Sequence, residues 1–317
     1  MRAATIREQQ IVIEEHPDPV AQAGEVLVRV RAAGLNGADM MQRRGLYPAP
    51  PGSPQDIPGM EFAGEVVALG PHPPGAARFA VGARVMGLVG GGAQAELVTL
   101  HERQAMPVPD GLDWPAAGGL PEVFMTAHDA IFVQAGLRCG ERLLVHGGAG
   151  GVGTAAIQLA RAAGAQVTAT VRSEGSRAQV AALGAEVIAP EGFAEHGPFD
   201  VILELVGAPN MAENVQALAT GGRISIIGVS AGAKAELNLL ALMGKRARIF
   251  GSTLRARPLE EKALSARLLE HEVLPLFEHS PPALSVPVAE TFTLDQAAAA
   301  YERFVAGGKI GKIVLTL

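Results

Sequence analysis

One glycine pattern limits what this chain can fold into more than any other part of its sequence. Residues 148–153 read G-A-G-G-V-G, directly after the apolar run 143–146 and directly before a helical pattern. A G-x-G-x-x-G pattern between a strand and a helix is typical of a turn that binds a dinucleotide pyrophosphate. Gly148 and Gly150 permit the tight turn and close approach to phosphates, and Gly153 permits close packing of helix on sheet. The alternative is an ordinary glycine-rich turn in an α/β sheet.

The sequence around this motif alternates short apolar runs with helical patterns. The apolar runs lie at 143–146, 166–171, 186–189, 200–206 and 223–229, and the helical patterns lie at 152–163, 176–183 and 208–218. Strands buried on both faces and separated by helices predict an α/β fold with a parallel, doubly wound Rossmann sheet. The connection at 190–199 is too short for a full helix.

The residues before Trp114 show a different pattern, in which short strand-like runs are separated by Gly and Pro. The clearest runs are 25–31, 61–68, 84–88 and 96–100, and the proline-rich segment 48–58 reads as a loop. This spacing predicts an antiparallel, barrel-like β domain. The tail, with helical patterns at 260–269 and 294–306 and a strand at 311–317, is too small to fold alone. We therefore expect a β-barrel domain of residues 1–115 and 255–317, with a Rossmann domain of residues 116–254 inserted in it.

Charge and cysteine content argue against several functions. The net charge is −6 and no block of Lys or Arg occurs, so we expect no nucleic-acid partner. There is no run of 18 or more apolar residues and no signal-peptide pattern at the N-terminus, so we expect no membrane segment. Cys139 is the only cysteine, which excludes an intrachain disulfide and fits a cytoplasmic localisation.

The end of the second Rossmann strand indicates which cofactor is preferred. Enzymes that use NAD place Asp or Glu there to bind the ribose 2′-hydroxyl. This chain has Arg172 and Ser173 instead, with Arg177 one turn into the next helix. Arginine binds a phosphate through forked, charge-assisted hydrogen bonds, so the segment predicts NADPH, although Glu174 is an unfavourable neighbour for a phosphate. The alternative is that both arginines only solvate the start of a helix.

Several further segments occur in a recognisable order. They are Asn36-Gly37-Ala38-Asp39, Gly45-Leu46-Tyr47-Pro48, G-M-E-F-A-G at 59–64, Leu120-Pro121-Glu122 with Thr126-Ala127, and the glycine motif from His146 to Thr154. Over nearly its whole length the chain resembles the quinone oxidoreductase branch of the medium-chain dehydrogenase/reductase superfamily. S-T-L-R-A-R at 252–257 and I-G-K-I-V at 310–314 resemble the subgroup of the tumour-suppressor-inducible quinone oxidoreductase. The resemblance implies a GroES-like catalytic domain, split by a Rossmann domain, in a homodimer that pairs through residues 248–252.

The resemblance also implies roles for individual residues. Asn36, Asp39 and Tyr47 would line the substrate side, with Tyr47 as the candidate hydrogen-bond donor to a substrate carbonyl. The alternatives are that Tyr47 packs in a turn and that Asp39 binds local backbone N–H groups. Thr126 and the backbone after Ser252 would hold the nicotinamide carboxamide. The full set expected to bind the cofactor is Met41, Thr126, Gly148, Gly150, Gly151, Val152, Arg172, Ser173, Arg177, Leu205, Gly228, Ser252, Thr253, Leu254 and Lys312.

Zinc-dependent relatives hold catalytic zinc with Cys and His at positions that align with Asn36 and Met60, and with a third ligand near Glu122. The four-cysteine cluster of their structural zinc is absent too, and the eight histidines are scattered without ligand spacing. We therefore expect no metal site. The lysine that normally binds the 2′-phosphate in this family is replaced by Ser176, so Arg172 or Arg177 would have to substitute.

These features favour an enzyme whose substrate accepts hydride without a metal. A quinone has a low-lying acceptor orbital, so positioning against the nicotinamide can supply much of the catalysis. We expect NADPH-dependent reduction of a small quinone or conjugated carbonyl compound. One alternative is an enoyl or alkenal double-bond reductase, which needs a proton donor. A remote alternative is a non-enzymatic crystallin-like or RNA-binding protein, which the net charge of −6 disfavours.

Overall fold

The computed structural model describes residues 1–73, 75–278 and 284–317. These residues form two compact units. The β unit comprises Met1–Met125, Leu254–Gly307 and Lys312–Leu317, and the α/β unit comprises Thr126–Thr253 and Gly308–Gly311. The structure keeps the chain in the β unit to Met125, whereas the predicted boundary lies at residue 115. The reason is helix α2 (Trp114–Gly118), in which Gly118 lies so close to Ala32 of the β unit that a Cβ on it would fall 2.6 Å from the alanine Cβ.

The α/β unit contains the predicted doubly wound sheet, in the strand order β10-β9-β8-β11-β12-β13. Every neighbouring pair of these strands is parallel. The strands are β8 (Arg142–Val145), β9 (Gln166–Thr170), β10 (Glu186–Ile188), β11 (Phe199–Glu204), β12 (Leu218–Ile226) and β13 (Arg248–Gly251). The order reverses between β8 and β11, and α/β sheets bind ligands beyond the carboxyl ends of their strands at such a reversal.

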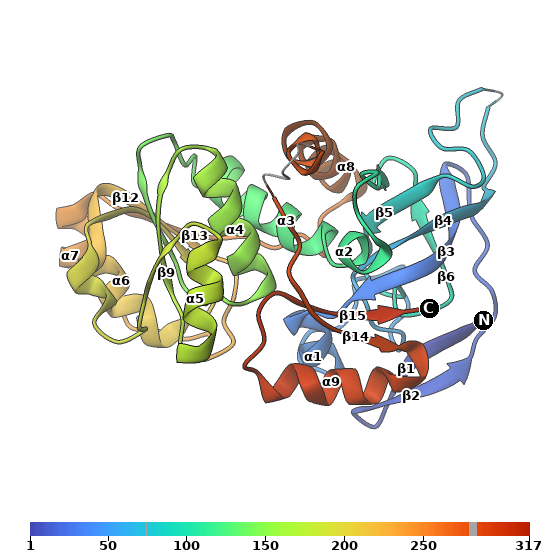
Figure 1. Ribbon diagram of the computed structural model, residues 1–317, viewed down its shortest axis with the longest axis horizontal. Helices are drawn as coiled ribbons and strands as arrows, with labels where there is room; N and C mark the ends of the chain where they lie inside the picture. The colour runs from blue at the N-terminus through green and yellow to red at the C-terminus, as the bar shows by residue number, and fades with distance from the viewer. Residues whose placement is uncertain (74, 279–283) are drawn as a thin grey trace. The chain divides into compact units, whose positions relative to one another are not determined.

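Helices connect these strands, and right-handed crossovers place those of the two halves on opposite faces of the sheet. They are α4 (Gly151–Ala162), α5 (Glu174–Ala182), α6 (Met211–Ala217) and α7 (Leu239–Lys245). Figure 1 shows α6 and α7 next to each other, in contact. The short connection before β11 holds only the 3-10 turn Phe193–His196, as predicted. Phe193, Phe199 and Ile202 pack in a buried cluster there, which explains why these strands read as continuous apolar runs.

The β unit is built on a seven-stranded sheet, which is antiparallel as the strand-like runs predict, except that its two C-terminal strands pair in parallel. Its order is β14-β15-β3-β4-β5-β7, with β6 paired to β3. The strands are β3 (Glu25–Gly34), β4 (Glu61–Leu69), β5 (Arg84–Leu88), β6 (Leu97–His101), β7 (Met106–Pro107), β14 (Val288–Thr293) and β15 (Lys312–Thr316). The last strand, β15, pairs with β3 and so joins the two ends of the chain in one sheet. Residues 44–60 contain no helix or strand, in agreement with the proline-rich loop.

Sequence reasoning missed the hairpin at the N-terminus. It consists of β1 (Arg2–Arg7) and β2 (Gln10–Glu15), joined by Glu8 and Gln9. Both turn residues have positive φ angles, 49° and 66°, which usually require Asn or Gly. The usual sequence signal of such a turn is therefore absent. Figure 1 shows the hairpin next to helix α9 (Ala297–Ala306), which contacts β2.

No helix among the described residues combines the length and apolar character that crossing a bilayer requires. On the α/β unit, β13 has no described neighbour on its outer side. Helix α7 exposes Leu239, Leu240 and Met243. An open edge with nearby apolar side chains is consistent with pairing to a second copy. The homodimer nevertheless stays a prediction.

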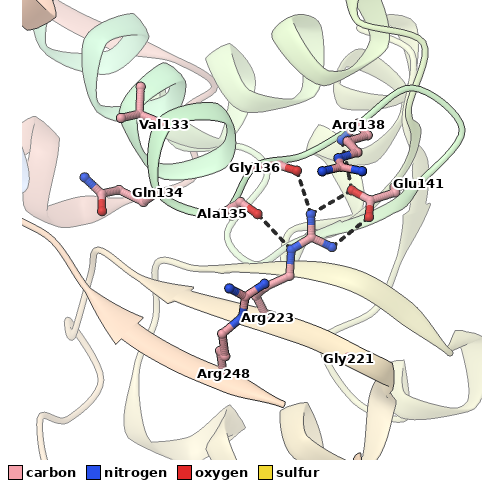
Figure 2. A pocket seen from close by; sticks show the side chains of 9 residues that line it. All are labelled: Val133, Gln134, Ala135, Gly136, Arg138, Glu141, Gly221, Arg223 and Arg248. Atoms are coloured by element: carbon pink, nitrogen blue, oxygen red, sulfur yellow. Dashed lines mark hydrogen bonds and ion pairs between the residues drawn. The ribbon is translucent and has the colours of Figure 1, made fainter. Parts of the chain in front are cut away.

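A cavity of about 360 Å³ lies in the α/β unit at the amino-terminal ends of the strands, away from the glycine motif. Figure 2 shows Arg223 on its wall, with the guanidinium bonded to both carboxylate oxygens of Glu141 at 2.8 Å. The same guanidinium donates to the carbonyls of Ala135, Gly136 and Asp200. All its donors are thus used to hold the turn before β8, so its role is structural.

Replacing Arg223 with Met should lower the stability of the protein markedly. The change removes the ion pair with the partly exposed Glu141 carboxylate and the donor to three carbonyls, and a hydrogen bond to a charged group contributes about 1.5–3 kcal/mol. Arg248→Met is the matched control, because Arg248 lines the same cavity but is exposed. Urea denaturation of both variants measures the difference. Equal stability of the two variants would contradict the role of Arg223.

Candidate functional site

The glycine turn has the geometry that a pyrophosphate site needs. The Gly148 N–H donates to the Thr170 carbonyl at 3.0 Å, which anchors the turn to the end of β9. Added Cβ atoms would clash: one on Gly148 lies 2.8 Å from the Ala169 Cβ, and one on Gly153 lies 2.5 Å from the Gly147 carbonyl. Gly150 is the N-cap of α4, so Gly151 and Val152 present the first free N–H groups of the helix. The turn therefore offers backbone donors and a helix N-terminus to an anion.

The residues expected to select the cofactor lie just beyond β9. Arg172 is exposed and Ser173 is the N-cap residue of α5. Arg177 donates from Nε to the Val171 carbonyl at 3.2 Å, which directs its side chain back toward the strand end. Ser176 is buried, so its hydroxyl is not offered to a ligand at the surface. Arg172 is thus the more exposed of the two arginines.

Other candidates follow the remaining strands of the same sheet. Gly228 lies so close to Leu205 that a Cβ on it would come 2.5 Å from the Leu205 carbonyl oxygen. Ser252 follows β13. Its N–H donates to the carbonyl of Ile226 on β12, and its Oγ donates to Asp129. Thr126, at the start of the unit, is buried. Most candidates outside the glycine motif follow the carboxyl end of a strand in this unit, and Thr126 is the exception. Thr253 comes directly after Ser252.

The β unit holds a buried polar cluster centred on Lys312. Its ammonium contacts Glu61 Oε1 at 2.6 Å and donates to Asn36 Oδ1 at 2.6 Å and to the Leu35 carbonyl at 2.8 Å. Asn36 Nδ2 in turn donates to Glu61 Oε1 at 2.9 Å. Lys312 is 3% exposed and Glu61 is fully buried. The three N–H donors of Lys312 are therefore used inside this unit, which does not support its expected role in binding the cofactor.

Asp39 lies in the same unit as the third residue of helix α1 (Gly37–Arg43) and is fully buried. Its carboxylate accepts from the backbone N–H groups of Asn36, at 2.9 Å, and Gly59, at 3.2 Å. Burial raises the pKa of Asp39 to about 6, against the opposing effect of these N–H groups and of the nearby charges of Arg255 and Lys312. This is the local structural role that the sequence left open for Asp39.

Tyr47 is half-buried, and it is held by a residue to which sequence reasoning gave no role. The guanidinium of Arg255 lies over the Tyr47 ring, 5.2 Å from its centre, and donates to the Tyr47 carbonyl at 3.2 Å. It also donates to the Gly90 carbonyl at 2.7 Å and to Gln42 of α1. Arg255 is 3% exposed. The only sequence signal was the arginine pair at 255 and 257. Of the other candidates in this unit, Met41 on α1 is partly exposed and Leu254 is buried.

Comparison with known proteins decides the family. A zinc-binding dehydrogenase family model matches residues 151–270, and an alcohol dehydrogenase GroES-like domain model matches residues 22–110. The quinone oxidoreductase of Mus musculus is 31% identical over 314 residues, covering 94% of this chain and 91% of that protein. The chain belongs to the medium-chain dehydrogenase/reductase superfamily. It is an oxidoreductase with the GroES-like and Rossmann domains of that superfamily, as the resemblance implied.

Two further comparisons bear on what a medium-chain dehydrogenase/reductase of this type does. The spectinabilin polyketide synthase system protein NorB of Streptomyces orinoci is 36% identical over 318 residues, covering 95% of this chain but 14% of that protein. A mycobacterial protein solved in complex with NADPH has a TM-score of 0.88 and 25% identity, covering all of both chains. The superfamily fold is that of nicotinamide-dependent oxidoreductases, and its quinone oxidoreductases and polyketide synthase segments are both relatives.

One of the matched family models is that of a zinc-binding dehydrogenase, but the residues at the expected ligand positions of this chain do not fit a zinc ion. Asn36 Oδ1 is bonded to an ammonium ion, Lys312, at the position where zinc-dependent members of the superfamily carry a ligand. Met60, at the second position, offers only a thioether, whereas proteins bind zinc through Cys, His, Asp and Glu. In residues 1–73, 75–278 and 284–317 no three His, Cys, Asp or Glu side chains gather in a group that could hold a metal. His279, one of the eight histidines, lies outside the described residues.

The stability of this medium-chain dehydrogenase/reductase should depend on the protonation of Asp39. Because its pKa is raised from 3.8 to about 6 in the folded state, Asp39 contributes stability that is complete below about pH 3.8 and is lost as the pH rises through about 6. The difference in unfolding free energy between wild type and Asp39→Asn should therefore fall by roughly 2 kcal/mol from pH 4 to pH 7. Urea denaturation at several pH values measures it, and parallel profiles of the two proteins would contradict the assignment.

Proposed function

We propose that this protein reduces quinones with NADPH by direct hydride transfer, without a metal. The observation that carries the proposal is the bonding of Asn36 and Glu61 to the Lys312 ammonium. Because these side chains are committed to one another rather than offered to a metal, the cluster favours a substrate that accepts hydride without a Lewis acid. Quinones meet that condition because their reduced oxygens can be protonated by solvent. The full-length similarity to the mouse quinone oxidoreductase supports the same substrate class.

The residues of the α/β unit fit a nicotinamide dinucleotide. A Cβ on Gly148 or Gly153 would occupy space that the close turn requires, so the motif has the packing of a pyrophosphate site. Arg172 supplies a cation for the 2′-phosphate of NADPH. A carboxylate at the same position would favour NADH. The mycobacterial neighbour in complex with NADPH supports this preference. When bound, NADPH supplies the hydride, and the residues of the chain bind and orient it.

Tyr47 is the candidate for orienting the substrate. Its hydroxyl makes no hydrogen bond that the structure describes, whereas its backbone and ring are fixed by Arg255. A phenol held in this way can donate to a carbonyl oxygen at little cost in side-chain entropy. Asp39 is fully buried and Asn36 is committed to Lys312 and Glu61, so neither is an available general acid.

The second candidate is an enoyl reductase that acts on a double bond conjugated to a carbonyl. The 36% identity to the polyketide synthase protein NorB favours it. That chemistry requires a donor that protonates the α carbon of the substrate. The oxygens of a reduced quinone, in contrast, can be protonated by solvent. A steady-state panel of ortho- and para-quinones, alkenals and enoyl thioesters with NADPH, with product identification, distinguishes the two. Turnover of the enoyl thioesters alone would reject the quinone proposal.

Arg172→Ala tests the cofactor preference. Loss of one charge-assisted contact to the 2′-phosphate costs about 1.5–3 kcal/mol, so the KM for NADPH should rise about tenfold or more. The KM for NADH should hardly change, because NADH has no 2′-phosphate. Arg138→Ala, which removes an exposed arginine at the opposite ends of the strands, is the matched control. An equal loss with both cofactors would show that Arg172 is structural.

Tyr47→Phe tests the role of the hydroxyl. As an orienting donor it should contribute about 1–2 kcal/mol, so the variant should lose about five- to thirtyfold in kcat/KM with a quinone. A general acid would lose about 10²–10⁴-fold and would change the shape of the pH–rate profile. Tyr301→Phe is the control, because Tyr301 is buried and donates to Gln94 at 2.9 Å.

Activity should also survive exhaustive chelation, and a loss that zinc restores would defeat the metal-free mechanism.

A further inference from the structure

A chain of buried hydrogen bonds runs across the carboxyl ends of three neighbouring strands in the α/β unit. It starts at the Gly147 N–H, which donates to Thr170 Oγ1 at 3.3 Å, and Thr170 Oγ1 lies 3.2 Å from His146 Nδ1. His146 Nε2 lies 2.8 Å from Asn214 Oδ1. Asn214 Nδ2 donates to Glu204 Oε2 at 2.7 Å. The four side chains are at most 3% exposed, so water does not compete for these bonds.

The direction of every bond in the chain is fixed from one end. The carboxylate of Glu204 only accepts, so the Asn214 amide must turn its NH₂ to Glu204 and its oxygen to His146. His146 Nε2 therefore carries the proton, and Nδ1 accepts from the Thr170 hydroxyl. That hydroxyl in turn accepts from the Gly147 N–H. Burial lowers the pKa of His146 and outweighs the opposing effects of Glu204 and Asn214, so the ring is neutral and its Nδ1 is free to accept from the Thr170 hydroxyl.

Each end of the chain holds a loop at the point where the strand order reverses. At one end, Thr170 anchors the glycine turn twice, through its hydroxyl to Gly147 and through its carbonyl to Gly148. At the other end, Glu204 Oε1 accepts from the N–H groups of Val206 and Gly207, at 2.7 and 2.8 Å. Those two residues form the loop after β11. The hydrogen bonds thus connect two loops that are distant in sequence and lie on the ligand-binding edge of the sheet.

We propose that Thr170 and His146 are positioning residues that couple the two loops, so that a nucleotide bound at the glycine turn orders the loop after β11. This inference rests on the proposed function, which assigns the adenosine phosphates to the turn and to Arg172. Neither residue contacts the nucleotide in this scheme. They act by fixing the orientation of the Asn214 amide and, through it, of the Glu204 carboxylate.

The test uses 2′,5′-ADP, a fragment that carries both phosphates of the adenosine half but no nicotinamide. Amide hydrogen exchange is measured for the segment that contains Val206 and Gly207, with and without saturating fragment. In the wild-type protein, bound fragment should slow exchange in this segment about tenfold. Thr170→Val keeps the shape of the side chain but removes the hydroxyl, and should abolish most of this protection. Thr170→Ser, which restores the hydroxyl, should recover it.

Thr168→Val is the matched control, because Thr168 is buried in the same strand two residues earlier and is not part of the hydrogen-bond chain. It should behave like the wild-type protein. If Thr170→Val does not fold, His146→Gln serves instead, since glutamine can still donate to Asn214 but offers no acceptor at the Nδ1 position. Normal protection in the folded variant at saturating fragment overturns the coupling alone. Failure of the fragment to bind the wild-type protein overturns the proposed function as well.

Discussion

The ion pair between Lys312 and Glu61 is the interaction on which the candidate site in the β unit depends. Both groups are buried, and a buried charge is tolerated only when it is paired and hydrogen-bonded. The pair fulfils this condition with partners from two other parts of the chain. Lys312 bonds to Asn36 after β3, and the second oxygen of Glu61 accepts from the Glu122 N–H at 2.8 Å, at the start of helix α3 (Pro121–His128). The side chain of Asn36 is therefore held rigidly by charges rather than by packing.

Much of the fold could be predicted because two periodicities dominate the sequence. Continuous apolar runs separated by helical patterns gave the parallel sheet, and the glycine motif marked its first turn. In both units the ends of most strands differ from the prediction by one or two residues. The N-terminal hairpin was missed because its turn residues, Glu8 and Gln9, adopt positive φ angles although neither is the Asn or Gly that usually marks such a turn. The strand β14 was missed because its six residues, VAETFT, are at most half-buried and form no continuous apolar run.

The candidate site was predictable where function depends on the backbone and much less so where it depends on distant side chains. Gly148 and Gly153 could be recognised because only glycine fits their local geometry. Arg255 could not, since its partners Gln42, Tyr47 and Gly90 lie more than a hundred residues away in the sequence. The commitment of Lys312 to Glu61 was hidden for the same reason. Sequence patterns show what a segment can form locally, and pairings of this kind exist only once the sheet has closed.

The pairing of β15 with β3 also determines when during synthesis the β unit can be completed. Nearly all of the α/β unit is contiguous, so its sheet can form as soon as those residues have left the ribosome. Glu61 precedes the α/β unit in the sequence, but the lysine that neutralises it, Lys312, follows that unit. Until then this carboxylate has no lysine to pair with, and an unpaired charge is costly to bury. The sheet of the β unit can therefore be completed around Glu61 only after β15 has been made, a step that comes later than the synthesis of the α/β unit.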